Sequence, residues 1–275
     1  MYHLKILLLF LSFLFFSCGS NSETNDSFIT LSPDTTWYIQ LEVDNDHPLK
    51  DIKEATVYDI DLFDASKEEI QRLKEEGKIV ICYFSAGTYE DWRPDKDRFP
   101  LEVIGNPYEG WEGEYWLDIR NEIVKQIMID RLKLAKEKGC DGVDPDNVNG
   151  YENNTGFNLT YSDQIDFNKF LSEEAHKLRL LIGLKNDLNQ INDLVDFFDF
   201  SVNEECHQYN ECDLLMPFIQ KNKSVFNIEY DEIYINDETA FQNLCEDAKN
   251  RNFRTLVMPY ELDGSFVKSC DYGEY

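Results

Sequence analysis

Acidic side chains gather at one point of this sequence, between an apolar stretch and a polar one. Residues 139–151 hold three aspartates, Asp141, Asp144 and Asp146, and then Asn147. Two glycines, a proline and several short polar side chains oppose a helix here, so we expect a buried strand that ends in a polar loop. The carboxyl ends of such strands carry the catalytic groups of α/β enzymes.

Polar residues also follow the other strand-like runs of the chain. They are, in chain order, Gln40, Asp59, Asp61, Ser85, Lys185, Asn186, Asp187, Asn203, Glu204 and Glu229. Each one alone is as well explained by a loop cap or an ion pair. Because buried unpaired charges cost free energy, their convergence on one rim of a barrel favours an active site.

Paired carboxylates without a serine or cysteine nucleophile beside a histidine are typical of glycosidic bond hydrolysis. One carboxyl protonates the leaving oxygen while the other attacks the sugar or activates water. Two strand ends on one rim can place carboxyls about 5–10 Å apart, which covers retaining and inverting chemistry. The residues alone do not choose between Asp144 and Asp146, or between Glu204, Glu205 and Glu229.

Histidine is scarce in the chain. The histidines are His3, His47, His176 and His207. We therefore expect no histidine-based metal site and no cofactor. An all-oxygen magnesium or calcium site made by Asp141, Asp144 and Asp146 is the alternative.

The elements that position these residues alternate between strands and helices. The strand-like runs are residues 36–41, 56–62, 79–84, 139–151, 180–186, 198–205, 223–230 and 254–260. Eight such βα-type units predict a (β/α)8 TIM barrel of the α/β class. A doubly wound open sheet is the alternative, but no glycine-rich phosphate loop follows the first strand.

Local signals place the helices between these strands. Ser66 with Glu69 three residues later predicts a capping box, and Gly77 predicts the end of that helix. Asp118 is expected to cap a second helix that ends at Gly139. Further helices are expected over residues 162–178 and 238–250.

An aromatic insertion follows the third strand, over residues 88–116. Its rings are Tyr89, Trp92, Tyr108, Trp111, Tyr115 and Trp116. A long segment without its own periodicity is usually a functional loop. The rings would either stack on sugar faces or pack the insertion onto the barrel.

The composition limits which classes of protein and which partners are compatible with this sequence. The chain has 275 residues with 42% hydrophobic content, enough for one large domain, and a formal charge of −28. This charge opposes nucleic acid as a partner and favours a neutral or cationic ligand, although acidity also aids solubility. We expect a monomer.

The N-terminal segment has the pattern of an export signal. Residues 1–17 contain Lys5 and an apolar run too short to span a bilayer, as in a signal peptide. Cys18 follows a small residue directly after that run, which predicts lipidation and a cell-surface or periplasmic lipoprotein, with simple secretion as the alternative. Residues 18–33 read as a flexible tether and 34–275 as the catalytic domain, so contact with a membrane is expected only through the lipid.

Six cysteines remain after Cys18, and an even number in an exported chain suggests disulfides. Cys206 with Cys212 and Cys245 with Cys270 are the expected pairs. Cys82 and Cys140 fall inside predicted strands, where free buried cysteine is the commoner state.

Several motifs together resemble glycoside hydrolase family 114. They are CYFSAGTYEDWRPD at residues 82–95, WLDIR at 116–120, DGVDPDN at 141–147, GLKND at 183–187, VNE at 202–204 and EY at 229–230. The resemblance runs from Trp37 to Tyr260. It implies a TIM-barrel endo-α-1,4-polygalactosaminidase that cleaves galactosamine-rich exopolysaccharide, built from galactosamine and N-acetylgalactosamine.

The same resemblance implies residue roles. Asp146 would be the nucleophile of a retaining mechanism, and Glu204 the general acid/base. Residues implied to line the sugar subsites, together with neighbours expected to support them, are Asp61, Tyr83, Trp92, Asp144, Asn147, Lys185, Asn186 and Glu229. Two other functions stay open: a non-catalytic carbohydrate-binding barrel, and an α-glycosidase of different sugar specificity.

Overall fold

The computed structural model describes residues 29–44 and 46–275. The expected signal peptide, Cys18 and most of the expected tether lie outside the described residues. The described chain already packs into the fold at Leu31, which is 4% exposed. None of the helices in the described part is long and apolar enough to span a bilayer.

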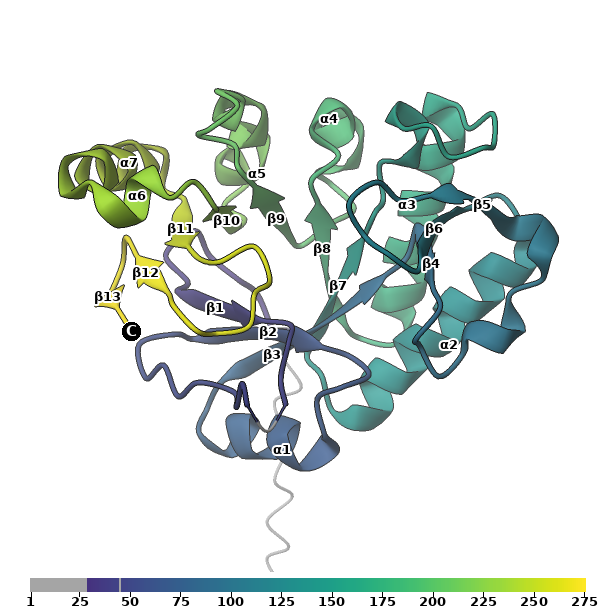
Figure 1. Ribbon diagram of the computed structural model, residues 1–275, viewed down its shortest axis with the longest axis horizontal. Coiled ribbons are helices and arrows are strands. Elements are labelled where there is room, and N and C mark those ends of the chain that lie inside the picture. Colours follow the sequence, from purple (N-terminus) through teal and green to yellow (C-terminus); the bar gives the residue numbers. More distant parts are fainter. Residues whose placement is uncertain (1–28, 45) are drawn as a thin grey trace, which may run out of the picture.

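Eight parallel strands form the barrel. They are β1 (Trp37–Gln40), β2 (Val57–Asp61), β3 (Ile79–Ser85), β7 (Gly142–Asp146), β8 (Leu181–Lys185), β9 (Phe200–Glu204), β10 (Val225–Glu229) and β11 (Arg254–Val257). Each pairs in parallel with the next in that order (Figure 1). Seven of them fall within a run predicted from the sequence, and β3 extends one residue beyond its run, to Ser85. The predicted α/β TIM barrel is therefore confirmed.

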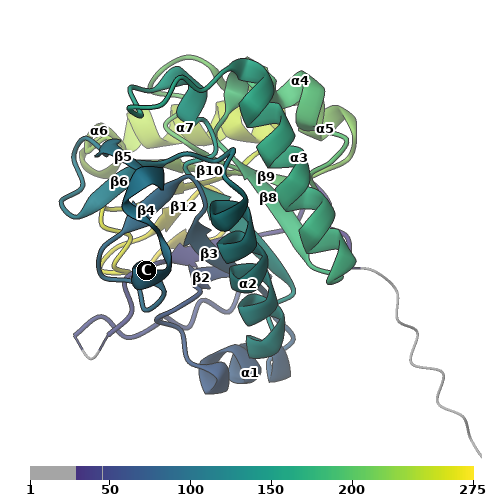
Figure 2. The same ribbon diagram turned by 90° about the vertical axis from the view of Figure 1, so that its right-hand side faces the viewer.

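Helices cover the outside of this sheet. They are α1 (Lys67–Glu75), α2 (Glu122–Lys138), α3 (Tyr161–Lys177), α4 (Ile191–Leu194), α5 (Met216–Gln220), α6 (Ile233–Asn236) and α7 (Glu238–Arg251). Short 3-10 helices lie in the connections, at Lys96–Arg98, Leu101–Val103, Gly150–Glu152, Leu188–Gln190 and Cys212–Leu215. Helices α2 and α3 lie side by side against the barrel (Figure 2).

The helix ends show which local signals were reliable. Ser66 and Glu69 form the predicted capping box of α1. The prediction that Asp118 caps the second helix was wrong, because α2 starts three residues later and its cap is the side chain of Asn121. Asp118 instead pairs with Arg120, at 2.7 Å from its Nε.

The barrel has a seam between its first and last parallel strands. The ladder runs from β11 into an antiparallel hairpin, β12 (Lys268–Ser269) and β13 (Gly273–Glu274), and no described strand pair joins β11 to β1. Side chains bridge the seam instead. Trp37 Nε1 donates to the Arg254 carbonyl at 2.9 Å, and Tyr272 Oη donates to the Trp37 carbonyl at 2.7 Å.

The aromatic insertion folds into a small sheet of its own. Strands β4 (Thr88–Glu90), β6 (Glu114–Leu117) and β5 (Ile104–Pro107) pair antiparallel in that order. We expected a loop without regular structure, and that was wrong. The strands have three or four residues each and β5 contains a register shift, so they are too short and irregular to show a period of two.

Three disulfides connect the barrel elements. Two match the expected pairs, Cys206–Cys212 and Cys245–Cys270. The third joins Cys82 to Cys140, so the expectation of free thiols there was wrong. Because β3 and β7 are neighbours in the sheet, Cys82 on β3 faces Cys140 just before β7, with their Cα atoms 6.1 Å apart.

Loss of the Cys82–Cys140 bond is expected to be costly because it closes a long loop. The two residues are 58 apart in sequence, for which loop-closure entropy gives a loss of about 4 kcal/mol in the free energy of unfolding. We expect urea denaturation of Cys82→Ala/Cys140→Ala to show a larger loss than Cys206→Ala/Cys212→Ala, whose loop spans 6 residues. Equal losses would contradict this account.

Candidate active site

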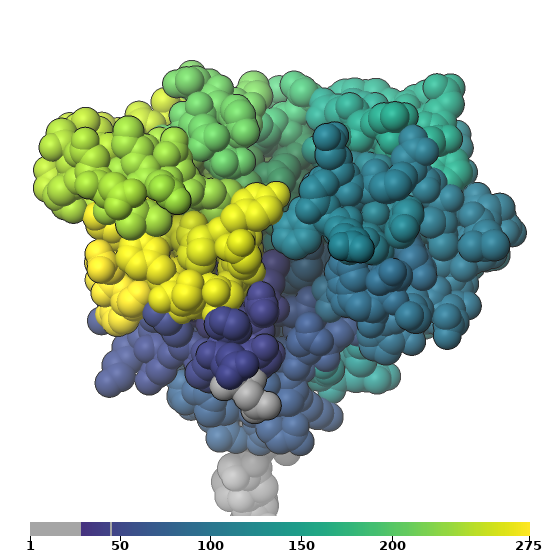
Figure 3. Space-filling view, viewed as in Figure 1, coloured from purple at the N-terminus to yellow at the C-terminus, as the bar shows by residue number. Residues whose placement is uncertain are grey.

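A cavity opens at the carboxyl ends of the barrel strands, with a volume of about 320 Å³. Its lining residues are Leu41, Glu42, Asp61, Asp64, Tyr83, Glu90, Trp92, Arg93, Tyr108, Trp111, Glu114, Asp146, Asn147, Asn149, Lys185, Asn186, Glu204, Tyr230, Tyr260, Glu261 and Leu262. On this face the insertion and the loop after β11 (yellow) approach each other across the mouth (Figure 3).

Asp146 is the last residue of β7 and stands at the floor of this cavity. Tyr83 Oη donates to its Oδ2 at 3.0 Å, and the backbone N–H of Asn147 donates to its Oδ1 at 2.7 Å. Burial, with the Asp146 charge adding to it, raises the pKa of Tyr83 far above its usual value, so the phenol keeps its proton. Both carboxylate oxygens are therefore fixed in direction.

Glu204 is the last residue of β9 and faces the same cavity. Tyr230 Oη donates to its Oε1 at 2.6 Å and Asn186 Nδ2 to its Oε2 at 3.0 Å. Burial opposes ionisation, but Lys185 and these two hydrogen bonds outweigh it and lower the pKa of Glu204. Glu204 is therefore a carboxylate at neutral pH.

Lys185 lies between the two carboxylates. Its Nζ is 3.5 Å from Asp146 Oδ2 and 3.7 Å from Glu204 Oε2, and its side chain is 2% exposed. Burial opposes its charge, yet Asp146, Glu204 and Asp144 together raise the pKa of Lys185. Since both carboxylate oxygens lie within 3.7 Å of one ammonium, they are no farther apart than about twice that distance. This upper limit allows the separations of both retaining and inverting glycosidases.

A buried polar network supports the backbone beside Asp146. Asn147 Nδ2 donates to Ser85 Oγ, Thr88 Oγ1 and Glu114 Oε1 at 3.0, 3.1 and 3.0 Å. Gly87 allows the backbone of Asn147 to lie this close, because a Cβ at position 87 would be 1.7 Å from the Asn147 carbonyl oxygen. The predicted Asn147 thus lines the cavity and also ties β7 to the insertion.

One wall of the cavity is held by a buried ion-pair network. Arg93 donates from both terminal nitrogens to Asp61, at 3.0 and 2.7 Å, and from Nε to Glu90 at 2.8 Å. Asp61 lines the cavity as predicted, but both of its oxygens are occupied by this guanidinium. Trp92 beside it is 50% exposed and also lines the cavity, with the Arg93 guanidinium 6.0 Å from the centroid of its ring.

Two residues expected to contact the sugar do not line the cavity. Asp144 lies one layer deeper in the barrel with no exposed surface. Glu229 is also fully buried, and accepts from Asn227 Nδ2 and from the backbone N–H groups of His207 and Gln208. Glu229 therefore anchors the loop after β9, and Asp144 supports the site from beneath.

Asp144 gives stability a predicted pH dependence. Burial raises the pKa of Asp144 to about 7, against the opposing Lys185 charge and with Asp146 and Glu204 adding to the rise. The pKa of Asp144 is higher in the folded state than its unfolded value of about 3.9. At pH values between the two, the folded state holds one more proton than the unfolded state. The free energy of unfolding therefore falls as the pH rises from about 4 to 7.

In urea denaturation at pH 4 to 8, the free energy of unfolding of Asp144→Asn should fall less steeply with rising pH than that of the parent, because Glu114 and Asp187 also have raised pKa values and keep their contributions. Parallel curves for variant and parent would contradict it.

The sequence pointed to most of the cavity but not to its roof. Of the predicted residues, Asp61, Tyr83, Trp92, Asp146, Asn147, Lys185, Asn186 and Glu204 come together there. Trp111 of the insertion stacks on Tyr260 of the loop after β11, with ring centroids 5.6 Å apart, and Tyr260 meets Tyr230 edge-on at 5.2 Å. The aromatic insertion signalled Trp111, but no pattern linked it to Tyr260, more than a hundred residues away.

The cavity continues on the other side of Glu204. A second space of about 380 Å³ shares Tyr108, Asn149, Asn186, Glu204, Tyr230 and Tyr260 with the first. Its other lining residues are Glu152, Asp187, Leu188, Asn189, Asn203, Glu205, Tyr209, Glu211 and Leu214. We call these two adjoining spaces together the groove, and Glu204 lines both of them.

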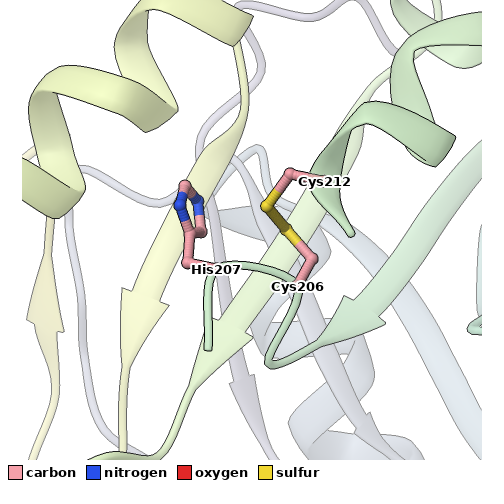
Figure 4. A group of neighbouring side chains, drawn as sticks. All are labelled: Cys206, His207 and Cys212. Atoms are coloured by element: carbon pink, nitrogen blue, oxygen red, sulfur yellow. A yellow bond between two sulfur atoms is a disulfide. The ribbon is translucent and has the colours of Figure 1, made fainter. Parts of the chain in front are cut away.

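The cluster of Cys206, His207 and Cys212 has the residue types of a metal site, but its sulfurs are bonded to each other (Figure 4). Disulfide sulfurs are not thiolate ligands, so only the imidazole of His207 could donate to a cation. Its Nδ1 lies 3.3 Å from Asp247 Oδ2. These residues do not fit a zinc site.

A barrel whose strand ends aim two carboxylates into an open groove defines a glycosidase-type active site. The family model of glycoside-hydrolase family GH114 matches residues 20–274, so the chain belongs to this family. The uncharacterized protein MJ1477 of Methanocaldococcus jannaschii is 35% identical over 91 residues, which are 32% of this chain. That match spans only 26% of the relative's own length.

Two solved structures have a similar fold. The chain is similar to Aspergillus fumigatus Ega3, crystallised in complex with galactosamine: 42% identity, 88% of this chain and 97% of that chain covered, TM-score 0.81. It is also similar in fold to the glycoside hydrolase domain of PelA from Pseudomonas aeruginosa, at 12% identity, with 83% and 95% of the chains covered and a TM-score of 0.62.

Proposed function

We propose that this glycoside hydrolase is an endo-acting enzyme that cleaves α-1,4-linked galactosamine and N-acetylgalactosamine polysaccharide by a retaining mechanism. The observation that carries the proposal is the Asp146–Lys185–Glu204 arrangement in a groove that continues on both sides of Glu204. A second space beside Glu204 would hold further sugars of a polymer, as endo cleavage requires. The galactosamine bound to Ega3 supports the choice of sugar.

The two carboxylates have different surroundings, and these support different roles. Asp146 is held by Tyr83 and its own neighbour's N–H, so one oxygen can be directed at an anomeric carbon. Glu204 must carry a proton to release the leaving group, although Lys185 and the hydrogen bonds from Tyr230 and Asn186 lower its pKa. A bound polymer excludes water, which favours the neutral acid, and Lys185 can then pair more fully with Asp146.

The charge of the chain supports a cationic substrate. A formal charge of −28 would attract a partly deacetylated, positively charged polymer. The aromatic rings of Trp92, Trp111 and Tyr260 offer faces for the sugars. Salt should therefore slow cleavage of deacetylated polymer more than cleavage of acetylated polymer.

We also propose that the protein works outside the cytoplasm. Three disulfides are typical of an oxidising compartment, and residues 1–17 followed by Cys18 have the pattern of a lipoprotein signal. Mass spectrometry of the mature N-terminus would test this, since a diacylglyceryl group on Cys18 supports it and an intact residue 1 contradicts it.

The deciding experiment is incubation with a purified galactosamine-rich exopolysaccharide of known acetylation. We expect a ladder of short oligomers by mass spectrometry, with the α configuration kept in the first-formed product by NMR. Release of monomers alone would contradict endo action. Binding of the polymer without any product would favour a non-catalytic carbohydrate-binding barrel.

A further inference from the structure

The seam of the barrel is bridged by side chains, and the bridge nearest the active site is the amide of Gln40. Gln40 is the last residue of β1 and has no exposed surface. Among the described strands none pairs β1 with β11, so no backbone ladder joins the loops that follow these two strands. Trp37 and Tyr272 bridge the amino end of the seam. At the carboxyl end, beside the cavity, Gln40 has this role.

The Gln40 amide is hydrogen-bonded on both of its sides. Its Oε1 accepts from Tyr38 Oη at 2.8 Å and from the Lys50 N–H at 3.1 Å. Its Nε2 donates toward carbonyl oxygens of the loops after β1 and β11. They belong to Glu42, His47, Pro48 and Asp263, at 3.1, 3.2, 3.4 and 3.1 Å. The reverse orientation would place the amide oxygen against these carbonyls, so the amide has a single orientation.

The loop after β11 packs directly against this amide. Gly264 has a left-handed backbone with φ of 73°, and a Cβ there would lie 2.5 Å from Gln40 Cδ. The N–H groups of Leu41 and Glu42 donate to the Leu262 carbonyl at 3.0 and 3.4 Å. Leu262 also has a left-handed backbone, with φ of 50°. A residue other than glycine keeps this conformation only where its surroundings fix it.

The same loop supplies part of the roof of the cavity. Its Tyr260 stacks on Trp111 and meets Tyr230 edge-on. Because the Tyr260 side chain is 55% exposed, burial alone fixes its position weakly. Tyr230 in turn donates to Glu204 at 2.6 Å. A continuous set of contacts therefore leads from Gln40 through this loop to the ring that holds Glu204.

We propose that Gln40 is a positioning residue for the aromatic roof of the active-site cavity. Its amide holds the loop after β11 and thereby sets Tyr260 against Trp111 and Tyr230. Gln40 itself does not line the cavity, so it acts only through this loop. The inference goes beyond the proposed function, and it rests on that function only for the substrate of the kinetic test.

The first test measures hydrogen exchange of the whole protein without substrate. Gln40→Met keeps the size of the side chain but removes the donor, and Gly264→Ala forces the loop away from the amide. In either variant we expect exchange over residues 41–42 and 260–264 to be at least about fivefold faster, because the loop opens more often. Exchange over β7 should be unchanged, which separates local opening from global unfolding.

The second test measures KM on galactosamine polymer. Both variants should raise KM about five- to tenfold, since a displaced roof packs less well on the sugar chain. Loss of stability alone would lower the measured kcat through the amount of folded enzyme and would leave KM unchanged. KM therefore separates a positioning role from a merely structural one.

A matched control removes a hydrogen bond from the other end of the seam. Tyr272→Phe deletes the bond to the Trp37 carbonyl, which is 2.7 Å long in the parent. It should lower the free energy of unfolding and leave both KM and exchange over residues 260–264 unchanged. If Tyr272→Phe changes them as much as Gln40→Met does, general loosening of the seam explains the effect and the proposal is overturned.

The remaining outcomes separate this inference from the proposed function. Unchanged exchange over residues 260–264 in both variants overturns the role of Gln40 even if the parent cleaves the polymer. Faster exchange with an unchanged KM also overturns it, because the loop would then not shape the binding space. If the parent cleaves no polymer, the proposed function fails, and the exchange results alone decide whether Gln40 holds the roof.

Discussion

Asp146→Asn should lower kcat on galactosamine polymer by at least about 10⁴-fold, because it removes the atom that would form the covalent intermediate. The fold should be retained. Asparagine has the same shape, and its oxygen can still accept from the Asn147 N–H. The measurement is kcat from reducing-end release, together with the free energy of unfolding. A variant with more than a tenth of the original activity would remove Asp146 from this role.

Azide provides a sharper test of the same residue. In Asp146→Ala, azide can occupy the space of the lost carboxylate and attack the anomeric carbon directly, so an activated α-galactosaminide should yield the β-glycosyl azide. Formation of the α-azide would instead assign Asp146 as the acid/base. Asp144→Asn is the matched control, since Asp144 is buried beneath the cavity and cannot reach the sugar.

Glu204→Gln should lower kcat on the polymer by about 10²–10⁴-fold, the usual contribution of a general acid/base. The loss should be smaller for the first step on an aryl galactosaminide, whose leaving group needs no proton. Glutamine keeps an oxygen for the hydrogen bond from Tyr230, at 2.6 Å in the parent, so the site should stay assembled. Steady-state and burst kinetics on the two substrates measure the difference.

Comparing the two leaving groups shows whether Glu204 acts as the general acid. Equal losses on polymer and aryl substrate would show that Glu204 does not act by protonating the leaving oxygen. Glu205→Gln is the control on the adjacent residue. Glu205 has a left-handed backbone at φ 59° and lies on the second side of the groove, outside the first cavity. We expect the kcat of Glu205→Gln on the aryl substrate to stay within a few-fold of the parent value.

The eight barrel strands could be predicted because each is a short, apolar, β-branched or aromatic run bounded by turn residues. The insertion could not, since β4 and β6 gain their stability from pairing with each other and from Asn147, which lies outside the segment. The same limit applies to the cysteines. Cys82 and Cys140 lie inside apolar runs, and only the neighbouring positions of β3 and β7 bring them together.

For the candidate site, the sequence pattern predicted which residues lie at the ends of strands, but not how deeply each of them is buried. Period-two alternation correctly puts Asp144 and Asp146 on one face, and the structure separates them by burial alone. Glu229 likewise ends a strand, but the loop after β9 folds back over it and takes its oxygens. Such contacts depend on loops whose course a strand pattern does not specify.

The described chain enters the barrel on the side away from the groove. Ser32 and Pro33 accept hydrogen bonds at 2.5 and 2.6 Å from Ser224 and Arg254, at the amino ends of β10 and β11. The groove lies at the carboxyl ends, on the opposite side. A lipid on Cys18, if present, would therefore join the chain on the side of the barrel away from the groove. Anchoring of this kind would leave the mouth of the barrel free to bind a polymer.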